Sequence, residues 1–125
     1  MLNQSRKSGF TLLELLIVVI IVSILAAVAL PRFGRMTRRA RTAEAFTAVG
    51  ALLTAETLYY QENGLFTSTI GNLLVDVDVT DFGYALTSAA TNARVVATGT
   101  AGSAFAGIVV TGTITDTGGR TVASN

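Results

Sequence analysis

Residues 10–30 of this 125-residue chain are FTLLELLIVVIIVSILAAVAL. They include one charged residue, Glu14, and two hydroxyl residues, Thr11 and Ser23. A helix of this length would be about 31 Å long at 1.5 Å per residue, which matches the hydrocarbon thickness of a bilayer. It would be apolar all around, and a chain this short can hardly enclose such a helix in a soluble core. The stretch therefore predicts a helix that inserts into a membrane.

Two kinds of membrane segment fit this apolar run. A secretory signal peptide would use Arg6 and Lys7 as its basic start and residues 27–29, Ala-Val-Ala, as its cleavage site. The run is longer than the usual apolar core of about 7–15 residues. Glu14 also places a carboxylate inside it, which is costly among acyl chains. Both features favour a helix that stays on the mature chain.

The sequence KSGFTLLE, residues 7–14, resembles the class III signal of type IV pilins and type II secretion pseudopilins. The resemblance extends to Pro31, where the family commonly has proline. It implies that a membrane-embedded prepilin peptidase cuts between Gly9 and Phe10 and N-methylates Phe10. Residues 1–9 would then be a removed leader, and residues 10–31 the transmembrane and filament-core helix.

Glu14 lies four residues after the expected cut. The new ammonium of Phe10 and the Glu14 carboxylate would both be poorly solvated in lipid, and pairing them offsets part of that cost. Glu14 could pair with the amine of its own chain, or with that of an incoming subunit, which would set the register of stacked helices. The resemblance implies the intersubunit pair. The alternative is a protonated carboxyl that supports the first helical turn.

After Pro31 the sequence becomes amphipathic, and residues 32–63 form the second half of one helix predicted over about residues 11–62. Glycine tolerates positive φ, so Asn63-Gly64 is the expected stop. Pro31 removes a helical hydrogen bond and predicts a kink, which Gly34 favours by lowering helix propensity. The resemblance implies a loss of helicity there on assembly, and a simple bend is the alternative. The expected apolar face comprises Met36, Ala40, Ala43, Phe46, Val49 or Gly50, Leu53 and Leu58.

Five of the nine basic residues cluster directly after the apolar run: Arg32, Arg35, Arg38, Arg39 and Arg41. By the positive-inside rule they would place the carboxyl side in the cytoplasm, whereas the family places the leader there. We follow the leader motif, because its peptidase acts on the cytoplasmic side. The arginines would contact lipid headgroups or acidic patches of neighbouring subunits, or form a solvated helix face.

Residues 64–125 are expected to form a small antiparallel sheet of three or four strands, which gives an α+β fold. The strand candidates, rich in Val, Ile, Thr and aromatic residues, are residues 73–79, 82–87, 94–98 and 108–115. Asp76, Asp78 and Asp81 lack EF-hand spacing, so a solvated strand face is favoured over a calcium loop.

The composition excludes several kinds of chemistry. Without cysteine or histidine, the chain has no disulfide, thiolate nucleophile or imidazole base. It also has no phosphate-binding glycine motif and no convergent acid pair, so an anchored enzyme lacks support, and we expect no catalytic residue, cofactor or metal. Residues 42–125 carry two arginines against seven carboxylates, a net charge of −5, which predicts no nucleic-acid contact.

The resemblance implies a prepilin that becomes the structural subunit of a type IV pilus, a helical homo-oligomer. The alternative is a pseudopilin that forms a short periplasmic piston in type II secretion. The implied partners are the prepilin peptidase, an inner-membrane platform protein, an assembly ATPase and the membrane itself. The prepilin would cross the inner membrane once with its leader in the cytoplasm, and then enter an extracellular pilus or a periplasmic pseudopilus. Its roles would be adhesion, twitching motility or secretion.

Overall fold

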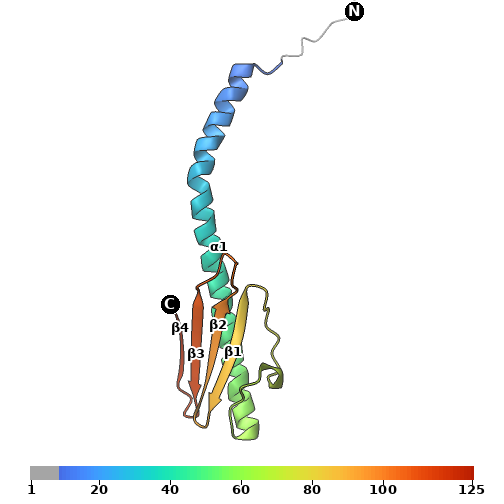
Figure 1. Cartoon of the computed structure of the whole chain (residues 1–125), viewed down its shortest axis with the longest axis vertical. Coiled ribbons are helices and arrows are strands. Elements are labelled where there is room, and N and C mark those ends of the chain that lie inside the picture. Colours follow the sequence, from blue (N-terminus) through green and yellow to red (C-terminus); the bar gives the residue numbers. More distant parts are fainter. Residues whose placement is uncertain (1–8) are drawn as a thin grey trace, which may run out of the picture. The chain divides into compact units, whose positions relative to one another are not determined.

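The computed structural model describes residues 9–125 and divides the chain into two compact units, Met1–Met36 and Thr37–Asn125 (Figure 1). Residues 1–8, which make up all but the last residue of the expected leader, lie outside the described residues. The helix α1 extends over Leu12–Asn63, 52 residues in all, and contributes to both units. The predicted single long helix is confirmed, with each end within one residue of its expected place.

The end of α1 follows the expected stop. Gly64 adopts a positive φ of 71°, and its N–H donates to the carbonyl of Tyr60 over 2.8 Å. A residue with a Cβ would be strained in this left-handed conformation, so glycine at this position lets the chain leave the helix.

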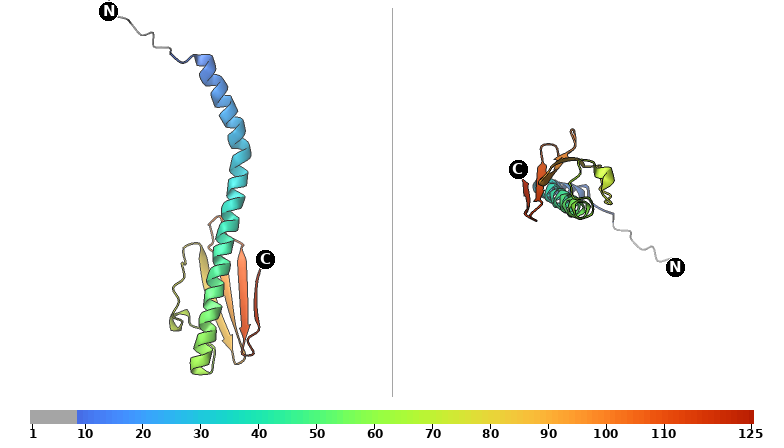
Figure 2. Two further views of the ribbon diagram at one scale, coloured as in Figure 1. Left: turned by 180° about the vertical axis from the view of Figure 1, so that it is seen from behind. Right: turned by 90° about the horizontal axis from the view of Figure 1, so that it is seen from below.

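The second unit contains one antiparallel sheet of four strands in the order β1-β2-β3-β4. The strands are β1 (Phe82–Ala89), β2 (Asn92–Gly99), β3 (Val109–Thr115) and β4 (Arg120–Ser124). Ala89 pairs with Asn92, so the exposed two-residue turn Ala90-Thr91 joins β1 to β2. Within this unit, the carboxyl-terminal part of α1 lies against one face of the sheet (Figure 2). The expected α+β arrangement is confirmed.

Two details of the predicted sheet were wrong. Residues 73–79 form no strand, and β4 takes the fourth place in the sheet instead. The alternation in residues 73–79 is nevertheless real, because Leu73 is buried and Val77 half-buried while Leu74 and Asp76 are exposed. Alternation shows which side chains face the protein, but a strand also needs a neighbour that supplies ladder hydrogen bonds. These residues belong to the connecting loop, residues 64–81, which leads from α1 to β1 and contains the short 3₁₀ helix Ile70–Asn72.

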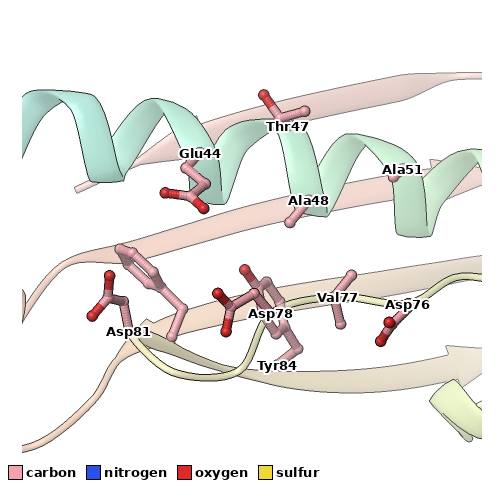
Figure 3. A pocket seen from close by; sticks show the side chains of 10 residues that line it. Glu44, Thr47, Ala48, Ala51, Asp76, Val77, Asp78, Asp81 and Tyr84 are labelled. Atoms are coloured by element: carbon pink, nitrogen blue, oxygen red, sulfur yellow. The ribbon is translucent and has the colours of Figure 1, made fainter.

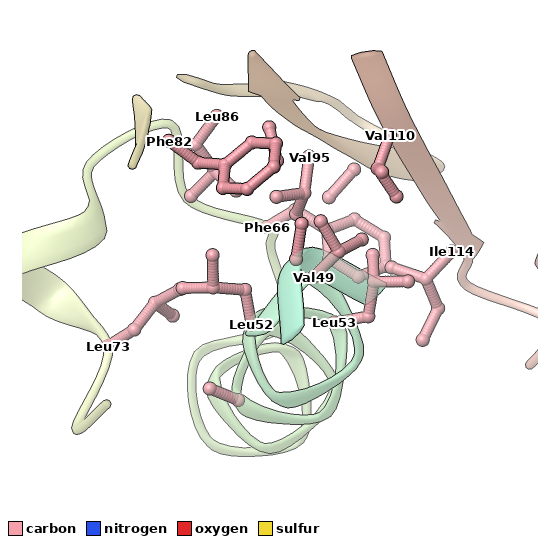
Figure 4. Packing of buried hydrophobic residues seen from close by; sticks show 14 of the residues in the cluster. Val49, Leu52, Leu53, Phe66, Leu73, Phe82, Leu86, Val95, Val110 and Ile114 are labelled. Atoms are coloured by element: carbon pink, nitrogen blue, oxygen red, sulfur yellow. The ribbon is translucent and has the colours of Figure 1, made fainter. Parts of the chain in front are cut away.

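A compact apolar core joins α1 to the sheet (Figure 4). Val49, Leu52 and Leu53 are fully buried on the helix, and Val95 and Val110 are fully buried on β2 and β3. The expected apolar face was correct at Val49 and Leu53, which are buried, and at Phe46, which packs against the core. Phe46 is half-buried. Four other residues of the expected face are exposed: Met36, Ala40, Ala43 and Leu58. The buried stripe comprises Ala45, Val49, Leu52, Leu53, Ala55 and Glu56.

Glu56 is a carboxylic acid within this core, with none of its surface exposed. Its Oε2 accepts a hydrogen bond from the backbone N–H of Thr67 over 3.2 Å, whereas Oε1 is buried without a hydrogen-bond partner. The hydroxyl oxygen of Thr67 in turn accepts from the Asn72 side chain over 3.0 Å. Glu56 therefore ties the connecting loop to α1, at the cost of one unsatisfied oxygen.

Glu56→Gln is expected to stabilise the second unit relative to wild type at high pH by about 1 kcal/mol or more, because it removes the cost of either ionising Glu56 in the core or holding its proton there. Burial raises the pKa of Glu56, and the Thr67 hydrogen bond opposes this rise. The folded chain therefore keeps this proton at pH values where the unfolded chain releases it. Wild-type stability is fully present below the unfolded pKa and falls as pH rises through the folded pKa.

Urea unfolding of the detergent-solubilised chain, followed by tyrosine fluorescence at pH 4.5 to 8.5, measures this effect. The three tyrosines all lie in the second unit, and the chain has no tryptophan. Glu62→Gln, at an exposed site on the same helix, is the matched control and is expected to change nothing. Equal pH slopes for wild type and Glu56→Gln would contradict the prediction.

Candidate processing and assembly site

The expected cleavage site lies just before α1. Gly9 and Phe10 are exposed and have no helical structure, and 78% of the Phe10 surface is accessible. A helical peptide bond is shielded by its own hydrogen bonds, so a bond outside the helix is easier for a peptidase to bind. Cleavage between these residues would expose an amine two residues before the first helical residue, Leu12.

The first turn of α1 is capped by the residues of the motif. Thr11 Oγ1 accepts a hydrogen bond from the backbone N–H of Glu14 over 3.2 Å. Thr11 and Glu14 also have the three-residue spacing of a capping box. The motif therefore contributes to the helix start.

The Glu14 side chain itself is exposed, and within residues 9–125 the structure gives it no ion pair. Phe10 still has an amide nitrogen here, because the leader is attached. Cleavage would convert this amide nitrogen into an ammonium, a charged group four residues before Glu14.

From Leu15 to Leu30 every residue of the helix except Ser23 is apolar. Within the described residues, one stretch of α1 is long and apolar enough to cross a membrane; over 18 residues its mean hydropathy is 3.0, and none of it is buried. The large apolar side chains from Leu12 to Met36 are each between 47% and 84% exposed. The hydroxyl of Ser23 donates to the carbonyl of Val19 over 2.7 Å, so it is satisfied within the helix. Glu14 is thus the polar side chain in this run that still needs a partner.

Pro31 and Gly34 lie within the continuous helix. Pro31 has no N–H to donate to the carbonyl of Ala27, so one helical hydrogen bond is missing there. A Cβ at Gly34 would meet no atom within 4 Å, so packing in the chain does not require glycine at this position. The kink stays a prediction.

The arginine cluster remains exposed, and the structure brings only one of its members to carboxylates. Among residues 9–125, Arg41 is the member with ion pairs: its Nη1 lies 2.8 Å from Glu44 Oε2, and its Nε lies 3.2 Å from Asp81 Oδ2. The Glu44 hydrogen bond, followed by the charge of Asp81, raises the pKa of Arg41. The helical spacing of Arg41 and Glu44 predicts their contact, but nothing in the sequence points to Asp81.

The remaining cluster members, Arg32, Arg35, Arg38 and Arg39, carry no ion pair in the part of the chain that the structure describes. The three loop aspartates do not assemble a metal site either. In residues 9–125, no group of three His, Cys, Asp or Glu residues is placed to hold a metal ion.

Comparison with known families gives one match. The prokaryotic N-terminal methylation motif covers residues 4–30, which include Gly9, Phe10, Glu14 and the whole apolar run, residues 10–30. A search of curated proteins finds no significant match. The α+β fold, with its long N-terminal helix on an open antiparallel sheet, is pilin-like. The chain thus carries the class III signal of type IV pilins and pseudopilins, joined to an apolar helix suited to anchoring it in the inner membrane.

Proposed function

We propose that this protein is a structural subunit of a type IV pilus or a related filament. The observation that carries the proposal is the unpartnered apolar helix directly behind the methylation motif. In the membrane this surface contacts lipid, and in a filament the same surface contacts other copies of the helix. We propose a structural role and no enzymatic one.

The assembly step follows from the geometry of the first turn. Prepilin peptidase cuts between Gly9 and Phe10 and methylates the new amine of Phe10. The Glu14 carboxylate of a docked subunit then pairs with the Phe10 ammonium of an incoming one. This contact joins two different surfaces of identical chains, and such a heterologous contact, when its rotation does not close, builds a helical fibre. A platform protein in the inner membrane and an assembly ATPase supply the motion.

The proposed topology places the leader in the cytoplasm and the second unit outside the inner membrane. This orientation is supported by the prepilin peptidase, which acts on the cytoplasmic side of the membrane. The five arginines after the apolar run oppose it by the positive-inside rule. An arginine-rich segment at the outer face needs partners there, such as headgroups or acidic residues of other subunits.

The second candidate is a pseudopilin of a type II secretion system, because the same signal occurs in both kinds of protein. A major pilin dominates the material sheared from the cell surface, whereas a pseudopilin stays in the periplasm in low copy number. The short second unit, in which residues 76, 78 and 81 have no EF-hand spacing, favours the pilus.

Mass spectrometry of sheared surface material tests the proposal. We expect an abundant chain that lacks residues 1–9 and begins with Phe10 bearing one methyl group. A bulky Gly9→Leu variant is the control, and it should accumulate with the leader attached. A mature chain beginning at residue 30, after Ala27-Val28-Ala29, would contradict the proposal, because the apolar helix would then have been removed as a signal peptide.

A further inference from the structure

A groove of about 240 Å³ lies between α1 and the connecting loop within the second unit. Its walls include apolar residues, among them Ala48, Val77 and Phe82. Its carboxylates come from both sides: Glu44 from the helix, and Asp76, Asp78 and Asp81 from the loop. Figure 3 shows Glu44 on the helix side of this space, with Asp78 and Asp81 across from it on the loop side. The groove is thus an apolar channel with a negative rim.

At one end of this rim, a guanidinium of the same chain is already bound. The Nη1 and Nε atoms of Arg41 form ion pairs with the carboxylates of Glu44 and Asp81, respectively. Among residues 9–125, Asp76 and Asp78 form no ion pair. Asp78 Oδ1 accepts from the N–H and hydroxyl of Thr80, and these hydrogen bonds, followed by the weaker effect of the Arg41 charge, lower the pKa of Asp78. Tyr84, which lines the same groove, has a raised pKa because of burial and then because of the negative charges of Glu44 and Asp78.

The complementary surface lies on the same helix, a short distance before the groove. Arg38 and Arg39 are exposed, and their charges have no ion pair among residues 9–125. An arginine fits such a channel well, because its aliphatic stem packs on apolar walls while its planar fork meets carboxylates. Tyr84 adds an aromatic ring on which a guanidinium can stack.

We propose that the groove of one copy receives Arg38 and Arg39 of a second copy of this chain, as a lateral contact in the filament. The inference rests on the proposed function, and it names the residues through which neighbouring second units bind each other.

Charge reversal tests the inference in cells that make filaments. The variant Arg38→Glu/Arg39→Glu is expected to yield about tenfold fewer sheared filaments than wild type, or less, because carboxylates would then face carboxylates across the contact. The amount of processed subunit in the membrane should be unchanged. Arg94→Glu, an exposed arginine on β2 outside the groove, is the control and should assemble normally.

Restoration distinguishes a direct contact from a general effect of charge. Adding Asp76→Arg and Asp78→Asn to the reversed chain removes the two rim carboxylates that Arg41 does not bind, places a guanidinium on the rim, and should restore filament yield. Adding Asp116→Arg and Glu62→Gln instead makes the same charge change at exposed positions outside the groove, and should not restore it.

Three outcomes would overturn the inference. Normal filaments from Arg38→Glu/Arg39→Glu would show that these charges are not needed for the contact. Failure of the rim variant to restore assembly, together with reduced subunit in the membrane, would assign the arginines to lipid headgroups. Absence of filaments from wild type would overturn the proposed function as well, so the two failures are distinguishable.

Discussion

Cells that carry Glu14→Ala in place of the wild-type subunit are expected to make no surface filaments, while the subunit is still cut, methylated and held in the membrane. The structure leaves the Glu14 carboxylate exposed and without an ion pair in the described residues, at the start of an apolar surface. Removing it would leave the Phe10 ammonium of the next copy unpaired among apolar helices. Losing one partner of a buried charge pair costs about 2–5 kcal/mol, which is about thirtyfold or more in an association constant.

Thr11→Ala separates this role of Glu14 from its place in the helix cap. Thr11 Oγ1 accepts the Glu14 N–H, so this variant removes the cap but keeps the carboxylate. A lost cap costs about 1 kcal/mol and should leave filaments at reduced yield. Electron microscopy of sheared fractions, with immunoblots of membranes for subunit level and processing, provides the measurement. Filaments of normal length and yield from Glu14→Ala would refute the pairing.

The second large effect is expected at Gly112 in β3. A Cβ placed on Gly112 would lie 2.5 Å from Val49 Cγ1 and 2.7 Å from Leu53 Cδ1. Both of these side chains are fully buried, so they have little room to move. Gly112→Ala should therefore lower the free energy of unfolding of the second unit by about 1–3 kcal/mol. At about 4–8 °C per kcal/mol for a domain of this size, the melting temperature falls by about 10 °C.

Two comparisons show that packing is the cause. Gly71→Ala is the neutral control, because a Cβ at Gly71 meets no atom within 4 Å. Val49→Ala combined with Gly112→Ala should recover part of the loss, since the smaller helix side chain makes room for the new methyl group. Melting curves from tyrosine fluorescence measure all variants. A melting temperature for Gly112→Ala at or above that of wild type would mean that the core can yield without cost, because strand propensity by itself favours alanine over glycine.

Much of this fold is predictable because its strongest signals are local. The apolar run and the stop at Gly64 indicate one long helix, and segments rich in Val, Ile, Thr and aromatic residues locate β1, β2 and β3. The strand β4 escaped prediction because residues 120–124 offer only one large apolar side chain, Val122, which is half-buried. Its Arg120 instead reaches α1, where Nη2 donates to the Gly50 carbonyl over 2.8 Å and Nη1 to Thr54 Oγ1 over 3.2 Å. Contacts between residues so far apart in sequence produce no periodic pattern from which a strand could be predicted.

One part of the candidate functional residues could be predicted from the sequence and another part could not. The candidate residues Gly9, Phe10 and Glu14 could be named from sequence because a peptidase would recognise a short linear segment. The carboxylate groove could not be predicted from the sequence, because Glu44 and Asp81 come together only when the loop folds back along α1. Glu56 could have been found, since it lies three residues after Leu53 and four after Leu52, on the buried stripe. Its charge conceals it in any search for apolar positions.

The turn Ala90-Thr91 has a practical consequence. It is exposed at the end of a hairpin, and neither residue lines the groove between α1 and the loop. Because the chain has no cysteine, Ala90→Cys would introduce a single thiol per subunit. A maleimide dye attached there would let the lengthening of fibres be filmed on living cells, with a label far smaller than a fused fluorescent protein.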